Sequence, residues 1–109
     1  MANKRVVNEH HQTFESIRQF DEEGHELWLA RQLAKVLEYS EYRHFQPVIE
    51  RAKDACRNSG HPVDDHFEDI LDMVEIGSSA KREIEDFRLS RYACYLIVQN
   101  GDPKLIIAE

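Results

Sequence analysis

The fold is decided by residues 27–39, Leu-Trp-Leu-Ala-Arg-Gln-Leu-Ala-Lys-Val-Leu-Glu-Tyr, because the hydrophobic period changes partway along this stretch. Leu27–Leu29 is a short apolar run typical of a buried strand, with Trp28 as its core anchor. The next apolar residues have the i, i+3, i+4 spacing of one helical face: Ala30, Leu33, Ala34, Val36 and Leu37. The pattern predicts a strand that passes directly into a short amphipathic helix.

Upstream of this stretch, the composition predicts a β-hairpin. The apolar residues that come first are spaced ambiguously between a helical turn and a strand, and we favour a strand near Ser16–Phe20. Residues 21–24, Asp-Glu-Glu-Gly, have the composition of a turn. The strand His25–Ala30 is therefore expected to pair back onto the first strand.

A second helix is expected soon after the first. Its apolar positions keep a helical period for three turns: Phe45, Val48, Ile49, Ala52, Ala55 and Cys56. Pro47 fits a helix best in its first turn, so the regular helix should begin near Phe45. The run Asn58-Ser59-Gly60 ends it.

The second half of the chain predicts another hairpin. Residues 63–69 are acidic and loop-like, with room for one helical turn. Strands are expected at Ile70–Ile76 and at Ile84–Leu89, the latter with a twist or bulge. The long tip between them would carry Lys81 and Arg82, which are suited to contacting a phosphate backbone.

The last expected element is a helix over Arg91–Asn100, capped by Ser90. Because this helix is apolar nearly all round, it should belong to the core and form part of an interface through Tyr92, Tyr95 and Val98. The expected fold class is α+β, a small single domain with an N-terminal β-hairpin, two short helices, a second β-hairpin and a C-terminal core helix.

The chain of 109 residues suits one domain. We expect residues 1–12 to be a flexible tail and residues 13–109 to form the domain, as part of a longer protein because the apolar end of the sequence lacks a cap. Cys56 and Cys94 lie in apolar contexts and are expected to be buried, reduced thiols. With no apolar run long enough for a membrane span or a signal peptide, a cytoplasmic protein is expected.

Charge limits where a nucleic acid could bind. The net charge is −7, and residues 58–109 account for most of it, with five Lys/Arg against eleven Asp/Glu. Residues 31–57 carry six Lys/Arg against four Asp/Glu, a balance of +2. Contacts to DNA should therefore come from this window or from the hairpin tip. The candidates are Arg31, Lys35, Arg43, Lys53, Lys81, Arg82 and Arg88. A solvated, salt-bridged surface is an equally good interpretation for any one of them.

Catalytic chemistry is not expected. No confident helix carries two histidines at i, i+4, and no Cys-x-x-Cys occurs, so the sequence predicts neither a metal site nor a cofactor. The carboxylates between Asp64 and Glu75 are interpreted as a solvated acidic loop rather than a magnesium site. No nucleophile has a base at the spacing of a catalytic motif, and we expect a protein that is not an enzyme.

Three stretches resemble a known family: residues 26–33 with 37–39, residues 45–52, and above all residues 86–103, Asp-Phe-Arg-Leu-Ser-Arg-Tyr-Ala-Cys-Tyr-Leu-Ile-Val-Gln-Asn-Gly-Asp-Pro. They are similar to the N-terminal part of the bacterial DNA-damage-inducible protein D family. More distantly, the strand and helix around Trp28 resemble the Bro-N domain of viral and phage antirepressor-like proteins. The resemblance implies a Bro-N-like fold, DNA binding and an SOS-induced role in which the recombinase RecA is inhibited on single-stranded DNA.

Two functional hypotheses remain open at this point. The first is a module that binds single- or double-stranded DNA through the cations named above. The second is a protein-interaction domain that docks on a recombinase filament or forms a homodimer, using the acidic second half and the apolar last helix.

Overall fold

The computed structural model describes residues 13–77 and 79–101. Residues 13–16 are helical, and the elements that follow are β1 (Gln19–Phe20), β2 (Glu26–Leu29), α2 (Ala30–Val36), α3 (Tyr42–Asn58), α4 (Val63–His66), β3 (Phe67–Glu75), β4 (Lys81–Leu89) and α5 (Arg91–Gln99). The expected α+β class and order of elements are confirmed. The predicted tail over residues 1–12 and the C-terminal residues after Gly101 lie outside the described residues.

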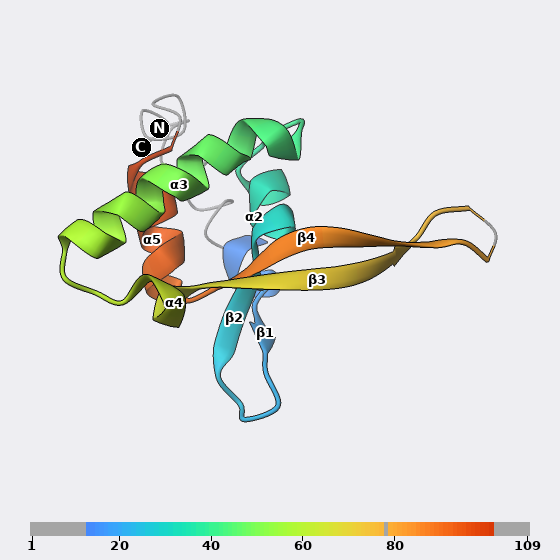
Figure 1. Ribbon diagram of the computed structural model, residues 1–109, viewed down its shortest axis with the longest axis horizontal. Coiled ribbons are helices and arrows are strands. Elements are labelled where there is room, and N and C mark those ends of the chain that lie inside the picture. The colour runs from blue at the N-terminus through green and yellow to red at the C-terminus, as the bar shows by residue number, and fades with distance from the viewer. Residues whose placement is uncertain (1–12, 78, 102–109) are drawn as a thin grey trace.

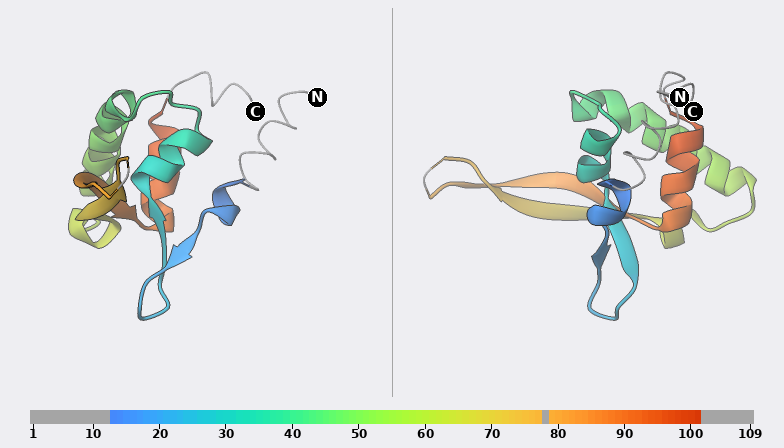
Figure 2. Two further views of the ribbon diagram at one scale, coloured as in Figure 1. Left: turned by 90° about the vertical axis from the view of Figure 1, so that its right-hand side faces the viewer. Right: turned by 180° about the vertical axis from the view of Figure 1, so that it is seen from behind.

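One antiparallel sheet with the order β1-β2-β4-β3 joins the two hairpins. The expected first hairpin is present, with Gln19 opposite Leu27. The second hairpin is attached to it where Trp28 lies opposite Leu89. Helices α2, α3 and α5 gather on one side of the molecule, while the β1–β2 and β3–β4 hairpins project from the body in different directions (Figures 1 and 2).

The core lies between the sheet junction and the helices, and Trp28 is its anchor as expected. Trp28 is fully buried, its ring stacks on Phe14 at 4.4 Å between centroids, and its indole Nε1 donates to the Phe14 carbonyl oxygen at 2.9 Å. Cys56 and Cys94 are buried and unpaired, and burial raises the pKa of both thiols. They therefore serve as packing residues rather than reactive ones.

Helix α2 receives its N-terminal cap from a residue far away in the sequence. Leu29 precedes the helix and makes no side-chain cap. The carboxylate of Asp86 accepts instead, through Oδ1, from the backbone N–H of Arg31 at 3.1 Å and from that of Phe87 at 2.8 Å. Asp86 is only 4% exposed. A buried carboxylate on β4 thus fixes the start of the helix that leaves β2.

The predicted start of the second helix at Phe45 was wrong. Helix α3 begins at Tyr42, which places Pro47 inside the helix, beyond its first turn. A residue other than proline at this position would donate its N–H to the carbonyl of Arg43, and the helix forgoes that bond. Tyr42 is half-buried against the core and near the Phe45 ring, and this packing favours the additional turn.

The first strand is shorter than predicted. Ser16, the first residue of the expected strand, belongs to a helical turn over residues 13–16, and only Gln19–Phe20 pair with β2. The turn brings Phe14 onto the Trp28 ring, a contact that an extended segment would not make in the same position. Burial against a distant aromatic ring therefore decided a local pattern that was ambiguous.

The second hairpin is longer than predicted, and its tip is shorter. Strands β3 and β4 pair over nine residues each in one continuous register, without the expected bulge. Lys81 and Arg82 belong to strand β4, opposite Glu75 and Val74, rather than to the loop. The predicted acidic loop over residues 63–69 is the single turn α4 followed by the start of β3.

Helix α5 matches its prediction closely. Ser90 caps it, with Oγ accepting from the N–H of Ala93 at 3.0 Å. Ala93, Cys94, Leu96 and Ile97 are buried, whereas Tyr95 is 56% exposed and Val98 43% exposed. The helix is therefore a core element with one open apolar side.

Replacing Asp86 with Ala is expected to lower the free energy of unfolding by about 1–3 kcal/mol, because two part-buried N–H groups lose their acceptor. Asp86→Asn keeps an acceptor oxygen and should cost less. Asp72→Ala is the control, because Asp72 is exposed, and it should shift stability by no more than about 0.5 kcal/mol. Urea unfolding measures all three, and equal stability of Asp86→Ala and the wild type would contradict the capping role.

Candidate nucleic-acid interface

Three of the predicted DNA-contacting cations lie on α2 and in the first turn of the next helix, α3. Arg31 and Lys35 are one helical turn apart on α2, and Arg43 lies in the first turn of α3. The Arg31 guanidinium lies 4.1 Å from the centre of the Tyr42 ring, and its Nε donates to the Glu85 carbonyl oxygen at 2.7 Å. This group of three cations on the two helices is called the helical cation group below.

Tyr42 contacts the helical cation group through Arg31. Burial, together with the nearby carboxylate of Asp86, raises the pKa of Tyr42 to about 12, so the phenol stays neutral at physiological pH. The ring therefore offers an uncharged face on which the Arg31 guanidinium stacks. Stacking and the bond to Glu85 hold Arg31 in one orientation.

The other two members of the group are more open to solvent. The Arg43 side chain is 73% exposed and forms an ion pair with Glu41 at 3.0 Å. Lys35 is exposed and has no ion pair within the part of the chain that the structure describes. Exposed pairs of this kind are weak, so both cations are available to another anion.

Lys53 and Arg88 lie apart from this group and make contacts within the domain. Lys53 is 17% exposed, and its Nζ lies 4.3 Å from the centre of the Phe87 ring and 3.4 Å from a carboxylate oxygen of Glu50. Arg88 forms an ion pair with Glu68 across the β3–β4 hairpin at 3.8 Å. Both cations therefore help to join elements of the fold.

Lys81 and Arg82 are separated from the other candidates by the length of the second hairpin. Arg82 and Arg88 are six positions apart, a distance of about 20 Å along an extended strand. The hairpin from residue 67 to residue 89 carries seven Asp/Glu against three Lys/Arg, a balance of −4. The two distal cations thus lie in an acidic environment, apart from the helical cation group (Figure 1).

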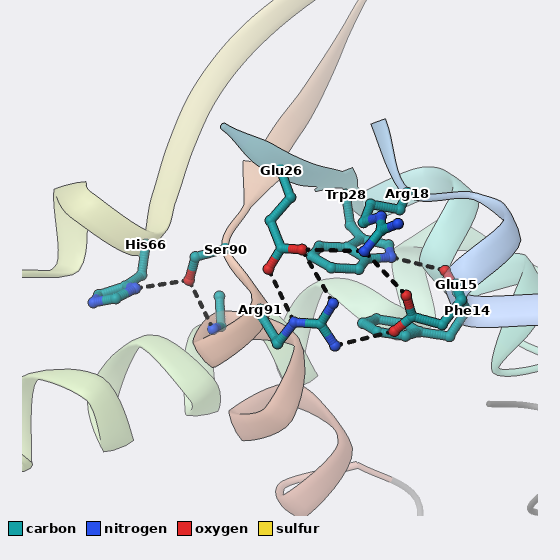
Figure 3. A network of polar contacts seen from close by, with 9 residues as sticks. Phe14, Glu15, Arg18, Glu26, Trp28, His66, Ser90 and Arg91 are labelled. Atoms are coloured by element: carbon teal, nitrogen blue, oxygen red, sulfur yellow. Dashed lines mark hydrogen bonds and ion pairs between the residues drawn. The ribbon is translucent and has the colours of Figure 1, made fainter. Parts of the chain in front are cut away.

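An ion-pair network that the sequence analysis missed lies beneath Trp28 (Figure 3). Arg91 donates to Glu26 through Nε at 2.9 Å and to Glu15 through Nη1 at 3.0 Å, and its guanidinium lies 5.0 Å from the centre of the Trp28 ring. Arg18 approaches Glu26 to within 3.5 Å. The network joins α5 to β2 and to the N-terminal helical turn, and no local pattern in the sequence marks it.

The predicted interface residues on α5 differ in their surroundings. Tyr92 is half-buried, and its ring lies 4.6 Å from that of His61 and 5.0 Å from that of His66. His66 is in turn bonded to the capping hydroxyl of Ser90, with 2.7 Å between Nδ1 and Oγ. Tyr92 is therefore largely occupied within the domain, whereas Tyr95 and Val98 remain exposed.

Neither a metal centre nor a membrane span is found among residues 13–77 and 79–101. No three side chains of His, Cys, Asp or Glu come together there in a way that would hold a metal ion. Within the same ranges, every helix is too short or too polar to cross a bilayer.

Comparison with known proteins identifies the family. Residues 16–107 match the model of the BRO family N-terminal domain, or Bro-N. The chain belongs to this family. The sequence is also 67% identical over 103 residues to DNA damage-inducible protein D of Escherichia coli (strain K12). No solved structure matches the sequence at a significant level.

The similarity to the E. coli protein covers 94% of this chain but only 38% of that protein. The chain thus spans less than half the length of the E. coli protein. The match to the family includes β1 to α5, so it covers both the helical cation group and the second hairpin.

The Arg91 network predicts how the stability of the Bro-N domain depends on pH. Hydrogen bonds from Arg91 hold the pKa of Glu26 below its ordinary value of 4.5. A carboxyl group with a lowered folded pKa stabilises the fold above its unfolded pKa, and this contribution is lost as the pH falls through the folded pKa. The stability advantage of the wild type over Glu26→Gln should therefore be full at pH 7 and shrink between about pH 5 and pH 2.

Urea unfolding over this pH range tests the prediction. Glu22→Gln is a matched control in the exposed β1–β2 turn and should follow the wild type at every pH. A difference between the wild type and Glu26→Gln that stays constant with pH would contradict the proposed role of the ion pair.

Proposed function

We propose that this Bro-N domain binds DNA in the response to DNA damage, with the helical cation group facing the phosphate backbone. The observation that carries the proposal is the 67% identity to a protein named DNA damage-inducible protein D, over a region that is a Bro-N domain. The distribution of charge supports it, because residues 31–57 have a balance of +2 within a chain of net charge −7. Such a role requires no catalysis and agrees with the expected cytoplasmic location.

Each member of the helical cation group has a role in this proposal. Lys35 and Arg43 are exposed and would replace counterions along the phosphates. Arg31 is held against Tyr42 and would contact a phosphate in a fixed direction. Lys53, Arg88, Lys81 and Arg82 are secondary candidates, because the Lys53 side chain is only 17% exposed and the other three belong to an acidic hairpin.

The double variant Lys35→Gln/Arg43→Gln should weaken DNA binding and lower the slope of log K against log salt concentration by about two, one for each lost phosphate contact. Fluorescence anisotropy of labelled single- and double-stranded DNA at several salt concentrations measures both quantities. Arg57→Gln is the matched control at the other end of α3, where Arg57 pairs with Asp54 at 2.7 Å. Its salt slope should stay close to that of the wild type.

Two results would count against this surface. If the wild-type protein shows no salt-dependent DNA binding at low ionic strength, the proposal of direct DNA contact is wrong. Wild-type binding that falls with Lys81→Gln/Arg82→Gln and not with Lys35→Gln/Arg43→Gln would move the contact to the end of the second hairpin.

The family resemblance also leads us to propose that the domain modulates RecA filaments on single-stranded DNA. The acidic second hairpin supports a contact with protein in addition to DNA, because a filament that binds DNA presents basic groups. The wild-type chain should then pellet with preformed RecA filaments and slow strand exchange. A chain that binds DNA in the anisotropy assay, yet neither pellets with the filaments nor changes strand exchange, would reject this part of the proposal alone.

A further inference from the structure

The β3–β4 hairpin projects much further than core packing requires. Phe67 and Leu89 at its base are buried, with 3% and 1% exposure. Beyond this base the paired strands leave the body, and their distal part extends away from the helices (Figures 1 and 2). A two-stranded ribbon gains little stability of its own in water, so its length calls for an explanation other than folding.

One face of this hairpin exposes two large apolar side chains. Leu71 is 66% exposed and Met73 is 55% exposed. In an antiparallel pair, directly opposed residues lie on the same face, and here Leu71 is opposite Glu85 while Met73 is opposite Glu83. Asp69 and Glu75 share this face because side chains alternate along β3. Two apolar groups are therefore surrounded by four carboxylates.

We call this surface the acidic–apolar face; it consists of Asp69, Leu71, Met73, Glu75, Glu83 and Glu85. Phe87, opposite Asp69, borders it on the side of the helices, where the Lys53 ammonium covers the Phe87 ring. Lys81 lies at its distal border, opposite Glu75. A face that served only to keep the hairpin in solution would carry polar groups in place of Leu71 and Met73.

The open edge of β3 is partly closed against an added strand. Two backbone hydrogen bonds at the ends of the β3–β4 ladder show which residues are hydrogen-bonded across it: Ile76 N–H donates to the Ala80 carbonyl, and Ser90 N–H donates to the His66 carbonyl. Both bonds join even-numbered residues, so the even-numbered residues of β3 and β4 exchange the hydrogen bonds between the strands. The N–H groups of odd-numbered β3 residues then point to the open edge. That of Met73 donates to the Asp72 carboxylate at 2.9 Å. This bond disfavours binding by strand addition and favours contact through the face.

We propose that the acidic–apolar face docks on a protein surface that places basic groups around an apolar contact. DNA is a poor occupant, because the hairpin has a balance of −4 and would be repelled by phosphate. A second copy of the face is a poor occupant for the same reason. A basic partner surface neutralises the four carboxylates while covering Leu71 and Met73. This inference rests on the protein contact proposed above for the second hairpin and names the face that would make it. The base of the face, at Glu85, adjoins Arg31 of the helical cation group, whereas Leu71, Met73, Glu75 and Glu83 lie further along the hairpin.

Three synthetic peptides of one length test this chemistry by isothermal titration calorimetry with the full chain. The first is an amphipathic helix with Leu on one face and Lys on the other; the second has Ser in place of Leu; the third has Glu in place of Lys. The Leu–Lys peptide should bind, and both others should bind about tenfold more weakly or worse. Equal binding of the Ser–Lys peptide would show attraction by charge alone and would overturn the proposal, as would no binding of the Leu–Lys peptide.

Variants of the chain locate the binding. Leu71→Thr/Met73→Thr keeps residues suited to strands and should weaken binding of the Leu–Lys peptide about tenfold. Tyr95→Ser/Val98→Ser removes comparably exposed apolar groups from α5 and should leave the affinity unchanged. Equal affinities for the wild type and Leu71→Thr/Met73→Thr would overturn the proposal.

Two further measurements separate this inference from folding and from DNA binding. In the wild type, methyl NMR signals of Leu71 and Met73 should shift on addition of the Leu–Lys peptide, and signals that shift only elsewhere would overturn the proposal. DNA affinity of Leu71→Thr/Met73→Thr should equal that of the wild type, so DNA binding and peptide docking can fail independently.

Discussion

The structure depends on one junction, where the strand carrying Trp28 meets the strand carrying Leu89. Without it the chain would be two separate hairpins, and an isolated hairpin is at best marginally stable in water. Asp86 on β4 stabilises the junction because its carboxylate caps α2. The Arg31 side chain also donates to the carbonyl oxygen of Glu85, the residue before Asp86 on β4. Each bond joins segments that are more than fifty residues apart in the sequence, so the junction fixes the tertiary fold rather than any local element.

The same junction connects two parts of the chain with different charge balances, +2 for residues 31–57 and −4 for the hairpin of residues 67–89. Asp86 on β4 fixes the start of α2, which carries Lys35, and Arg43 lies in the first turn of the helix that follows. The second hairpin leaves the junction in another direction and takes most of the carboxylates of the chain's second half with it (Figure 1). This arrangement supports two contacts by one small domain, a nucleic acid on the helices and a basic protein on the hairpin.

Local patterns in the sequence were sufficient for much of the fold. The change of period at Leu29 and the Ser90 cap predicted the strand, the first helix and α5, because each signal lies within the element that it specifies. The predictions failed where contacts with residues distant in sequence determine the local structure. Packing of Tyr42 on the core extended α3 past the expected start. Burial of Phe14 on Trp28 accompanies a helical turn over residues 13–16, which includes Ser16, the first residue of the expected strand.

The site was harder to predict for a related reason. The second hairpin is exposed over most of its length, so its ends lack the alternation of buried and exposed residues that marks a strand, and Lys81 and Arg82 were assigned to a loop. The roles of Asp86 and Arg91 depend on partners at the other end of the chain. Arg31, Lys35 and Arg43 could be named among the candidates because they lie in the basic window of residues 31–57, but the stacking of Arg31 on Tyr42 could not be predicted.

The claim that two surfaces divide the contacts is tested most directly by an amide NMR titration of the full chain with a short DNA duplex. The account predicts shift changes at residues 31–35 and in the first turn of α3, with the distal hairpin, residues 71–75 and 81–83, unaffected. Shift changes concentrated on the distal hairpin, with α2 and α3 unaffected, would contradict it.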